Sequence, residues 1–600
     1  MQTEVEKGGG SMNQSAIDIQ QLGDRAFLLR WKEQVESSTV AGMARALAEL
    51  ILPWLQEVVP ASRTIAFYMK SGEYDMGKAA EEAVRLLQGI KGLKQHRLRH
   101  VELPVIYGGD AGPDLAECAR RSGLSIEQFV DRHAETRYEV AMIGFAPGFP
   151  YLSGLHDSLA QPRRDTPRMS VQAGSVGIAG NRTGVYSVSS PGGWQIIGRT
   201  PVPLFRPEAE RPFLLAQGDT VKFIPVSADA EIPVVPNEPT PAFAHDSGSG
   251  ERISNSALSV IKPGLLTTIQ DLGRTGWQAY GVSVGGAMDE TSMRKANLLL
   301  GNEEAAAVLE LTLIGGSYLV ESDILIAICG ADLRATVDGA GLPLNKPILL
   351  RGGTRIDFGS VLTGCRAYVA IAGGFDAPLV LGSRSTDPRA RIGGGFGRAL
   401  IAGDTIGVMP LSPLSRELMK KLGSKADDSG LRWSETDWSA KGWEESLPFA
   451  VQPLRKPLQL TIRVLLGAEW EQFAKESKAT LFEEPFKVDA SSDRMGMRLS
   501  GHPLKREFED ELESRGVVPG TIQVPPSGQP IILTAGCQPT GGYPIIAHVI
   551  RADIPLLAQA APGDLLTFEF VDLITAERAL RHRERDIAIL KAGVRIRARG

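Results

Sequence analysis

The chain has 600 residues, which at a usual domain size of about 150 residues predicts roughly four domains. Lysine plus arginine (65) nearly balance aspartate plus glutamate (70), so the net charge of −5 provides no basic surface and argues against a nucleic-acid partner. Glycine (66) and proline (38) are abundant but show no collagen period, which favours short strands joined by tight turns.

The cysteines and the N-terminus indicate a cytoplasmic protein. Neither a disulfide framework nor a zinc site is expected, because the four cysteines never form a CxxC pair, and we expect no protein-bound metal site. No secretory signal is visible, and no apolar run approaches the length of a membrane helix. Residues 1–11 contain Gly-Gly-Gly-Ser before Met12 and are interpreted as an added linker or a natural tail.

Residues 12–105 are predicted to form a small α+β domain. Its expected elements are a hairpin at 16–34, a helix from Val40 to Gln56, a strand from Thr64 to Tyr68, a helix from Met76 to Leu87 and a closing strand from His96 to Val105.

Residues 106–226 are predicted to be a barrel preceded by two helices. Pro113 opens the first helix, and Ser125 with Gln128 forms a capping-box pattern for the second. From Tyr138 onward the sequence consists of short apolar runs cut by glycine and proline, which is typical of a barrel or sandwich.

A proline- and serine-rich linker at 227–256 divides the chain into two halves. The second half is again rich in strands and has one helix near 291–300. A polar stretch from Ser424 splits it into parts at 257–423 and 424–600, and a docking helix with one apolar side is expected at the C-terminus.

An internal repeat links the two halves. Gly192-Gly193-Trp194-Gln195-Ile196-Ile197 is echoed by Gly541-Gly542-Tyr543-Pro544-Ile545-Ile546. Each copy follows a Gly-hydroxyl-aliphatic step, at Gly174-Ser175-Val176 and at Gly520-Thr521-Ile522. We therefore expect related β-barrels in both halves, and a mainly β fold with an α+β N-terminal domain.

The densest motif is Gly144-Phe145-Ala146-Pro147-Gly148-Phe149-Pro150-Tyr151-Leu152. Its prolines and glycines impose a rigid, sharply turned loop that holds aromatic rings. The loop is either an aromatic plug over a barrel end or a wall of a small-molecule pocket. In the second case Gly148, Phe149 and Tyr151 contact the substrate.

A run of arginines follows, from Pro162 to Arg168. It is either a solvated charge run or an anion site in which Arg163 and Arg168 present guanidinium forks to a carboxylate or phosphate. Polar and stacking groups suited to an amide-like substrate come next, and the candidates are Ser175, Asn181, Thr183, Tyr186 and Trp194.

The second half and one helix end supply the remaining candidates. Arg274, Gln538, Thr540 and Tyr543 are candidate substrate-binding residues beside glycine turns. Asp289, Arg494 and His133 are the candidate catalytic residues, although each Asp-Arg pair also fits a structural salt link and His133 a structural role at a helix end. We find no phosphate loop, no HExxH motif and no G-x-S-x-G nucleophile elbow in a strand-to-helix setting.

Together these motifs resemble two partner families. Ala173–Val176, Gly144–Leu152 and Pro191–Thr200 resemble the B subunit of bacterial 5-oxoprolinase, also called the allophanate hydrolase subunit 1 or Kip family. Further motifs resemble the C subunit, at 263–274, 286–289, 296–302, 493–496 and 540–544. The chain resembles a B–C fusion over about residues 15–600, with the break in the linker.

The resemblance implies cyclophilin-like barrels in both halves and ATP-dependent opening of 5-oxoproline, a small lactam, to glutamate. It also implies a separate A subunit of 5-oxoprolinase, with the B–C unit phosphorylating the lactam oxygen from ATP, accompanied by Mg²⁺, and with arginines neutralising phosphate charge. Whether the protein forms a homo-oligomer is left open by the resemblance.

Two other functions remain as alternatives. The same domains resemble the carboxyltransferase region of urea carboxylase, which works with a biotin carrier, and this chain has no Ala-Met-Lys-Met biotin motif. They also resemble histidine-kinase inhibitors of the Kip type, in which the barrel surface would bind a protein.

Overall fold

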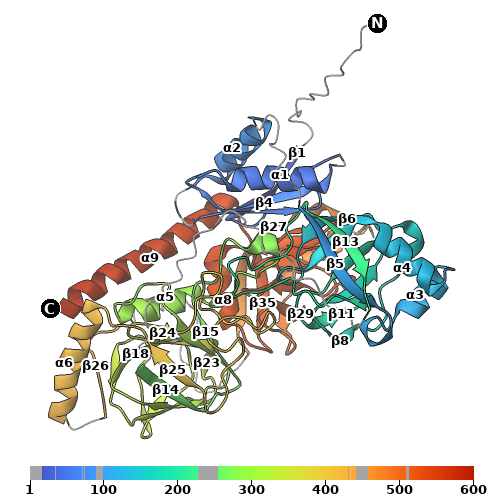
Figure 1. Ribbon diagram of the computed structural model, residues 1–600. Helices are drawn as coiled ribbons and strands as arrows, with labels where there is room; N and C mark the ends of the chain where they lie inside the picture. Colours follow the sequence, from blue (N-terminus) through green and yellow to red (C-terminus); the bar gives the residue numbers. More distant parts are fainter. Residues whose placement is uncertain are drawn as a thin grey trace.

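The structure, a computed structural model, describes residues 17–33, 35–70, 72, 74–89, 99–227, 255–429, 432–440, 457–508 and 512–599. The predicted tail at 1–11 and nearly all of the predicted linker at 227–256 lie outside these residues. The described residues form an α+β domain, a closed barrel, a pair of packed sheets and a second closed barrel (Figure 1). The predictions of a mainly β chain and of a barrel in each half are confirmed.

The N-terminal domain is a four-stranded antiparallel sheet of order β1-β2-β4-β3 with two helices packed on it. Its elements are β1 (Ile17–Gln21), β2 (Ala26–Trp31), α1 (Ser37–Ala48), β3 (Leu55–Ala61), β4 (Thr64–Met69) and α2 (Met76–Gly89). Phe27 and Phe67 stack in its core with ring centroids 4.9 Å apart. Aromatic and alanine-rich faces thus bury one side of a small sheet.

Two predictions for this domain were wrong. The helix expected to reach Gln56 ends at Ala48, and β3 follows it, because Val58 and Val59 pair with β4 in the sheet. The strand expected to close this domain at 96–105 is β5 (His100–Tyr107), which belongs to the first barrel. The predicted domain boundary at 105 therefore falls inside a barrel strand, whose partner β13 lies far along the sequence.

The first barrel closes seven strands in the order β10-β7-β6-β13-β5-β12-β9. Besides β5, these are β6 (Arg137–Ile143), β7 (Pro150–Ser153), β9 (Ser175–Ala179), β10 (Arg182–Val185), β12 (Gln195–Arg199) and β13 (Thr220–Pro225). Outside the barrel lie η2 (Gly109–Ala111), α3 (Leu115–Arg121), α4 (Ile126–Glu135), η3 (Asp157–Leu159) and the pair β8 (Arg168–Val171) and β11 (Ser190–Gly192). The capping box predicted from Ser125 and Gln128 is confirmed at the start of α4.

Two sheets packed on a common apolar core form the first part of the second half. One sheet contains β14 (Asn255–Lys262), β17 (Ser317–Val320), β19 (Thr336–Val337), β20 (Ala340–Gly341), β22 (Arg355–Asp357), β24 (Phe375–Asp376) and β25 (Thr405–Val408). The other contains β15 (Leu266–Gln270), β16 (Val308–Thr312), β18 (Ile324–Asp332), β21 (Ile348–Leu350), β23 (Thr363–Ile371) and β26 (Trp433–Glu435).

Helices flank these sheets, and the last strand corrects a boundary. The helices are η4 (Gln278–Tyr280), α5 (Glu290–Leu299), which confirms the helix predicted near 291–300, and α6 (Pro413–Ser429). β26 pairs with β21, so this part extends beyond its predicted end at 423. Ser424 itself lies within α6, where Ser424, Lys425 and Asp427 are exposed.

The second barrel also closes seven strands. They are β27 (Gln459–Leu466), β28 (Phe486–Val488), β29 (Gly496–Ser500), β31 (Thr521–Gln523), β32 (Ile531–Leu533), β34 (Ile545–Val549) and β35 (Leu565–Phe570). Around it lie η6 (Trp470–Gln472), α7 (Lys475–Glu483), the pair β30 (Arg515–Gly516) and β33 (Thr540–Gly541), η7 (Arg551–Asp553), α8 (Ile554–Gln559) and the C-terminal α9 (Leu573–Arg599).

The two barrels are equivalent strand by strand, as the internal repeat predicts. Read around each barrel from its parallel pair, β13-β5-β12-β9-β10-β7-β6 corresponds to β35-β27-β34-β31-β32-β29-β28. The small two-stranded pairs also correspond, because Arg168 lies opposite Gly192 and Arg515 lies opposite Gly541. The Gly-Gly-aromatic repeat thus marks the same position in both barrels.

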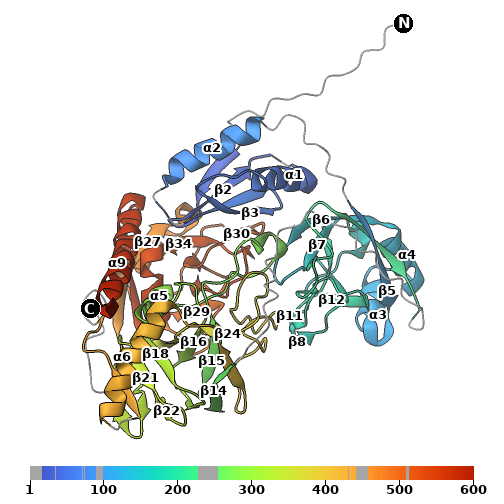
Figure 2. The same cartoon turned by 60° about the vertical axis from the view of Figure 1, so that its left-hand side comes forward.

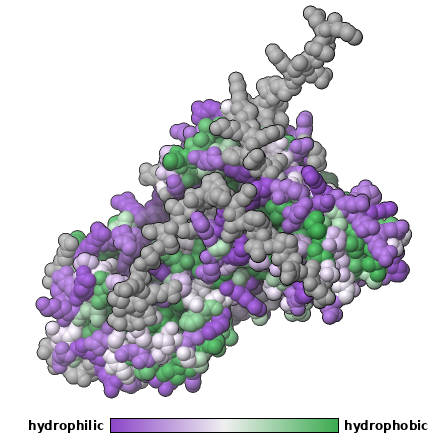
Figure 3. Space-filling view, viewed as in Figure 1, coloured by the Kyte–Doolittle hydropathy of each residue, from purple (hydrophilic) through white to green (hydrophobic). Residues whose placement is uncertain are grey.

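The second barrel lies between the first barrel and the packed sheets, with the N-terminal domain above it in both ribbon views (Figures 1 and 2). Tyr68 Oη of the N-terminal domain donates to the Val517 carbonyl oxygen at 3.0 Å. α9 runs from this domain, where Leu573 packs on its core, to α6, where Lys421 Nζ donates to the Ala598 carbonyl oxygen at 2.7 Å. The face shown in Figure 3 is largely hydrophilic with smaller hydrophobic areas between, as is usual for folded domains.

Candidate functional site

The loop from Gly144 to Phe149 lies against the second half of the chain. Gly148 N–H donates to the Tyr280 carbonyl oxygen at 2.8 Å. A Cβ atom at Gly144 would lie 2.5 Å from Thr540 Oγ1, and one at Gly281 would lie 2.5 Å from the Ala146 carbonyl oxygen. Both approaches are too close for any side chain, so these glycines allow the two halves to touch.

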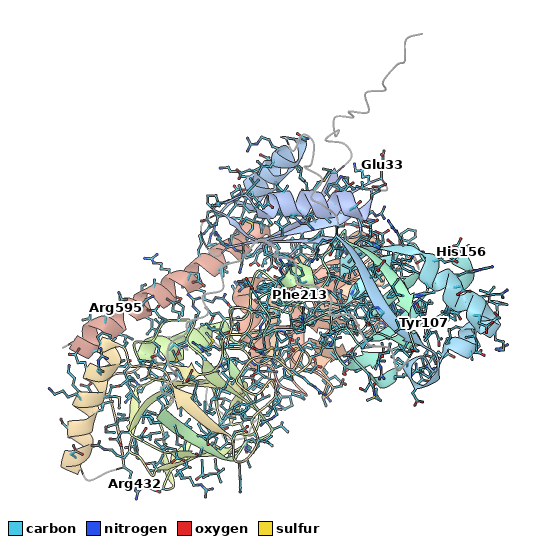
Figure 4. The ribbon with its side chains drawn as sticks, in the orientation of Figure 1. Glu33, Tyr107, His156, Phe213, Arg432 and Arg595 are labelled. Atoms are coloured by element: carbon cyan, nitrogen blue, oxygen red, sulfur yellow. The ribbon has the colours of Figure 1, made fainter. Side chains whose placement is uncertain are left out.

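Apolar rings seal the contact beside this loop. Phe213, labelled near the centre of the molecule in Figure 4, stacks on Tyr280 with centroids 4.6 Å apart. Phe205, Val282 and Leu381 are buried with it. The first barrel and the second half therefore share an apolar contact next to the motif loop.

Five aromatic side chains meet over the same end of the first barrel. Phe149 is the centre, with its ring 5.0 Å from Tyr151, 5.1 Å from Tyr186, 5.4 Å from Phe145 and 5.5 Å from Trp194. Most of these contacts are edge-to-face, the arrangement that aromatic quadrupoles favour. Phe149, Tyr186 and Trp194 are buried, whereas Phe145 and Tyr151 are half-buried and form the open side.

Arginines from both halves surround this open side. Arg389 places its guanidinium over the Phe145 ring, 4.5 Å from the centroid. Burial raises the pKa of Tyr151 to about 12, although Arg163, Arg389 and Arg182 each favour its ionised form. We call the set of Phe145, Phe149, Tyr151, Tyr186, Trp194, Arg163 and Arg389 the junction cluster.

The predicted arginine run separates into two roles. Arg164 and Arg168 bind Asp114, with N–O distances of 3.2 and 2.8 Å. Asp114 Oδ2 also accepts a hydrogen bond of 2.6 Å from Ile196 N, so this ion pair ties the run to β12. Arg168 Nη1 is buried and has no hydrogen-bond partner among the described residues, and Arg163 is exposed. Of the three arginines in this run, Arg163 is therefore the one left available to bind a ligand beside the aromatic rings.

The second barrel has the equivalent ion pair. Arg515 Nη2 bonds Glu469 Oε2, and that oxygen accepts from Ile545 N at 2.9 Å. Arg515 and Glu469 are both buried, at 6% and 2% exposure, and Arg515 Nη1 also donates to Gln20 Oε1 of the N-terminal domain at 3.2 Å. The N-terminal domain therefore covers the Arg515–Glu469 pair of the second barrel.

His133 and Thr183 lie in the core of the first barrel. His133 Nε2 is 3.0 Å from Thr183 Oγ1, and its Nδ1 is 2.8 Å from Tyr107 Oη. Burial lowers the pKa of His133 to about 3, so the ring is neutral near pH 7. The structure does not bring His133 to the junction cluster. Ser175 is the first residue of β9, and Asn181 lies in the turn between β9 and β10.

Asp289 and Arg494 belong to a buried polar network. Arg494 Nη1 bonds Glu310 Oε1, and Glu310 Oε2 accepts from Met288 N and Tyr368 Oη, each at 2.8 Å. Asp289 caps α5 by accepting from Ser292 N at 2.9 Å. Burial raises the pKa of Asp289, although Ser292 and Gln559 bond its carboxylate. Glu310 was missed from sequence because it lies in a strand whose residues are otherwise mainly apolar.

The remaining candidates are spread over the second half. Arg274 is 1% exposed, and its guanidinium donates to the carbonyl oxygens of Val380 and Ser385. Its Nη1 has no hydrogen-bond partner in the part of the chain that the structure describes. Thr540 lies against Gly144, whereas Gln538 is half-buried and Tyr543 is 49% exposed. Their roles in binding stay predictions.

The structure thus joins Gly148, Phe149, Tyr151, Arg163, Tyr186, Trp194 and Thr540 at one place, and adds Phe145 and Arg389. Among the described residues, no group of three or more histidine, cysteine, aspartate or glutamate side chains is arranged to hold a metal ion. Nor does the described part of the chain contain a helix long and apolar enough to cross a membrane.

Family models match both halves of the chain. The model described as carboxyltransferase domain, subdomain C and D, matches residues 17–215. The model described as carboxyltransferase domain, subdomain A and B, matches residues 280–570.

Two named subunits and one solved structure match over nearly their whole lengths. The C subunit of 5-oxoprolinase from Escherichia coli K12 is 36% identical over 328 residues, which is 55% of this chain and 96% of that protein. The B subunit of 5-oxoprolinase from Bacillus subtilis 168 is 42% identical over 225 residues, which is 35% of this chain and 92% of that protein. The crystal structure of TTHA0988 matches with a TM-score of 0.71 and 33% identity, over 91% of this chain and 99% of that one. The chain therefore belongs to the carboxyltransferase-domain family of the 5-oxoprolinase B and C subunits, with counterparts of both in one polypeptide.

Proposed function

We propose that this chain is the B–C component of an ATP-dependent 5-oxoprolinase, which opens 5-oxoproline to L-glutamate together with a separate A subunit. The observation that carries the proposal is that relatives named as the B and C subunits each align over more than nine-tenths of their length. A multi-subunit enzyme implies a partner, and the lettering of these relatives leaves an A subunit to be supplied by another chain.

The junction cluster is the proposed substrate site. Phe145 and Tyr151 offer ring faces to a small lactam, and Arg163, Arg182 and Arg389 offer donors to its carboxylate or to phosphate. Mg²⁺ would arrive with ATP, because this ion is commonly held by substrate phosphates and only one or two carboxylates. ATP and Mg²⁺ are part of the proposal.

The proposed reaction consists of one phosphoryl transfer and two additions of water. The γ-phosphoryl group moves from ATP to the lactam oxygen and leaves ADP. Water then adds to the ring carbon, the C–N bond breaks to give an acyl phosphate, and a second water releases phosphate and glutamate. Donors near the lactam oxygen would stabilise the charge that develops there.

A reconstituted assay tests the proposal. The chain is mixed with a purified 5-oxoprolinase A subunit, ATP, Mg²⁺ and 5-oxoproline, and release of phosphate and glutamate is followed. The proposal expects both products only when the chain, the A subunit and 5-oxoproline are all present. ATP turnover that does not depend on the lactam would contradict it.

Carboxyl transfer is the second candidate function, because both matching family models are described as carboxyltransferase domains. It would require a carboxylated biotin carrier as donor. Transfer of labelled carboxyl groups from free carboxybiotin to urea, without lactam-dependent ATP turnover, would favour this alternative.

A further inference from the structure

Arg389 is held in the junction cluster by a rigid turn. Asp387 Oδ1 accepts from Arg389 N and from Ala390 N, each at 3.0 Å. Asp387 and Ile392 also exchange backbone hydrogen bonds of 2.9 and 3.2 Å. The turn therefore fixes the Arg389 backbone beside the junction cluster before any ligand binds.

The Arg389 guanidinium has no acidic partner among the described residues. Its contacts are the Phe145 ring at 4.5 Å and Met495 Sδ, 3.8 Å from Nη1. The two acids whose charge acts on Arg389 are Asp387 and Asp493, and neither forms an ion pair with it in the described part of the chain. Asp493 Oδ1 accepts instead from Met495 N at 2.8 Å and from Gly496 N at 3.0 Å. By contrast, Arg494, which follows Asp493 in the sequence, forms an ion pair with Glu310.

This arrangement leaves room for a bound anion, because the half-buried Arg389 side chain keeps its charge without an ion-pair partner among the described residues. Burial lowers the pKa of Arg389, which shows that its charged form is partly desolvated. Among the described residues the only hydrogen-bond contact of the guanidinium is Met495 Sδ, a weak acceptor, so most of its donors are available to a ligand. A carboxylate bound in the forked geometry would satisfy two of them at once.

The groups around Arg389 are aromatic. Phe145 has a positive φ of 66°, a conformation that is uncommon for a bulky residue and that occurs at binding loops. The Phe145 ring faces Arg389. Phe149 contacts both Phe145 and Tyr151, so the three rings form one group. Phe145 and Tyr151 come from the first barrel and Arg389 from the second half, so this site is complete only when the two halves are docked.

We propose that Arg389 binds the carboxylate of the lactam substrate, whose ring lies against Phe145 and Tyr151. This inference rests on the proposed function for the identity of the lactam. It adds the residue that would distinguish 5-oxoproline from an uncharged lactam, and it explains why counterparts of both subunits are needed to form the site.

Binding of two ligands to two variants provides the direct test. The ligands are 5-oxoproline and pyrrolidinone, the same ring without the carboxylate, measured by calorimetry with the full chain and no ATP. We expect Arg389→Gln to weaken 5-oxoproline binding about 10- to 100-fold, the loss typical of a charge-assisted hydrogen-bonded pair, and to leave pyrrolidinone binding unchanged. Arg389→Lys should recover part of the loss.

The control is Arg85→Gln, which removes the same charge from an exposed position on α2 and should change neither affinity. Equal weakening of both ligands by Arg389→Gln would overturn the inference, and so would unchanged 5-oxoproline binding. Thermal unfolding of each variant shows whether it is folded.

Kinetics separate this inference from the proposed function and from a phosphate-binding role. In the reconstituted assay, Arg389→Gln should raise KM for 5-oxoproline and not KM for ATP; the reverse result would assign Arg389 to phosphate and overturn the proposal. If the wild-type chain shows no lactam-dependent ATP turnover but binds 5-oxoproline through Arg389, the proposed function fails and the site stands. If the wild-type chain does not bind 5-oxoproline, the site fails.

Discussion

Gly144 of the first barrel touches Thr540 of the second barrel so closely that a Cβ atom at Gly144 would lie 2.5 Å from Thr540 Oγ1. The two residues belong to the motif loop and to the Gly-Gly-aromatic repeat, which are far apart in sequence. Their contact couples the barrels at the junction cluster.

We expect Gly144→Ala to loosen this contact and to destabilise the chain by about 1–3 kcal/mol, the usual cost of overpacking. Thr540→Ala removes the Oγ1 atom in question, so the double variant should recover most of the loss. Denaturant unfolding of the two single variants and the double variant measures the coupling. Strictly additive effects would show that the two residues do not constrain each other.

Glu57 links the N-terminal domain to the turn before η4 and should make this link pH-dependent. Its carboxylate accepts from Gly276 N at 2.8 Å and from Gln278 N at 2.5 Å. Burial raises its pKa to about 7, although these backbone amides favour the charged form. The native fold therefore holds the proton more tightly than the unfolded chain does.

The stability contributed by this group is fully present below about pH 4.5, falls as the pH rises and is lost above about pH 7, a change of about 3 kcal/mol. Urea unfolding from pH 5 to pH 8 should show a steeper decline for the wild type than for Glu57→Gln. Parallel profiles for the two proteins would rule out Glu57 as the titrating group.

His133 should act on acid stability and not on turnover. Burial lowers its pKa to about 3, below the value of about 6.5 in the unfolded chain, so stability is lost as the pH falls from about 6.5 toward 3. His133→Gln keeps a hydrogen-bonding side chain without a titrating charge and should make acid unfolding shallower. His548, whose pKa burial also lowers to about 3, continues to titrate in this variant.

The same His133→Gln variant tests its predicted catalytic role. If His133 is structural, lactam-dependent phosphate release at about pH 7.5, where the ring is neutral, should be retained by the folded variant. A folded variant with no turnover would restore His133 as a catalytic residue.

The buried pair Arg515–Glu469 should be far more sensitive to substitution than an exposed pair. Arg515→Met leaves the Glu469 carboxylate buried without its cation, which typically costs about 3–5 kcal/mol. Adding Glu469→Gln should recover part of this loss. Arg120→Met, which breaks an exposed pair with Glu117, serves as the control and should leave the unfolding midpoint unchanged. Equal effects of Arg515→Met and Arg120→Met would contradict the prediction.

Local patterns predicted much of the architecture. The Gly192-Gly193-Trp194 and Gly541-Gly542-Tyr543 repeat predicted two related barrels, and their strand orders correspond throughout. One error arose where pairing is long-range: β5 reads as the end of the N-terminal domain, but its parallel partner is β13, more than 100 residues further along the chain. The other was local, because β3 begins within the residues expected to continue α1 and pairs with β4. The β-propensity of its residues can identify a strand, but it does not show which other strand pairs with it.

For the candidate site, the sequence by itself determined the aromatic loop around Phe149, because closely spaced glycines and prolines leave the backbone few conformations. Only the tertiary structure decided which charges meet that loop. It paired Arg168 with Asp114 and Arg494 with Glu310, and it brought Arg389 over Phe145 from the other half of the chain. The physical reason is that an arginine's partner depends on the position of distant acids in space, which the order of residues along the chain does not specify.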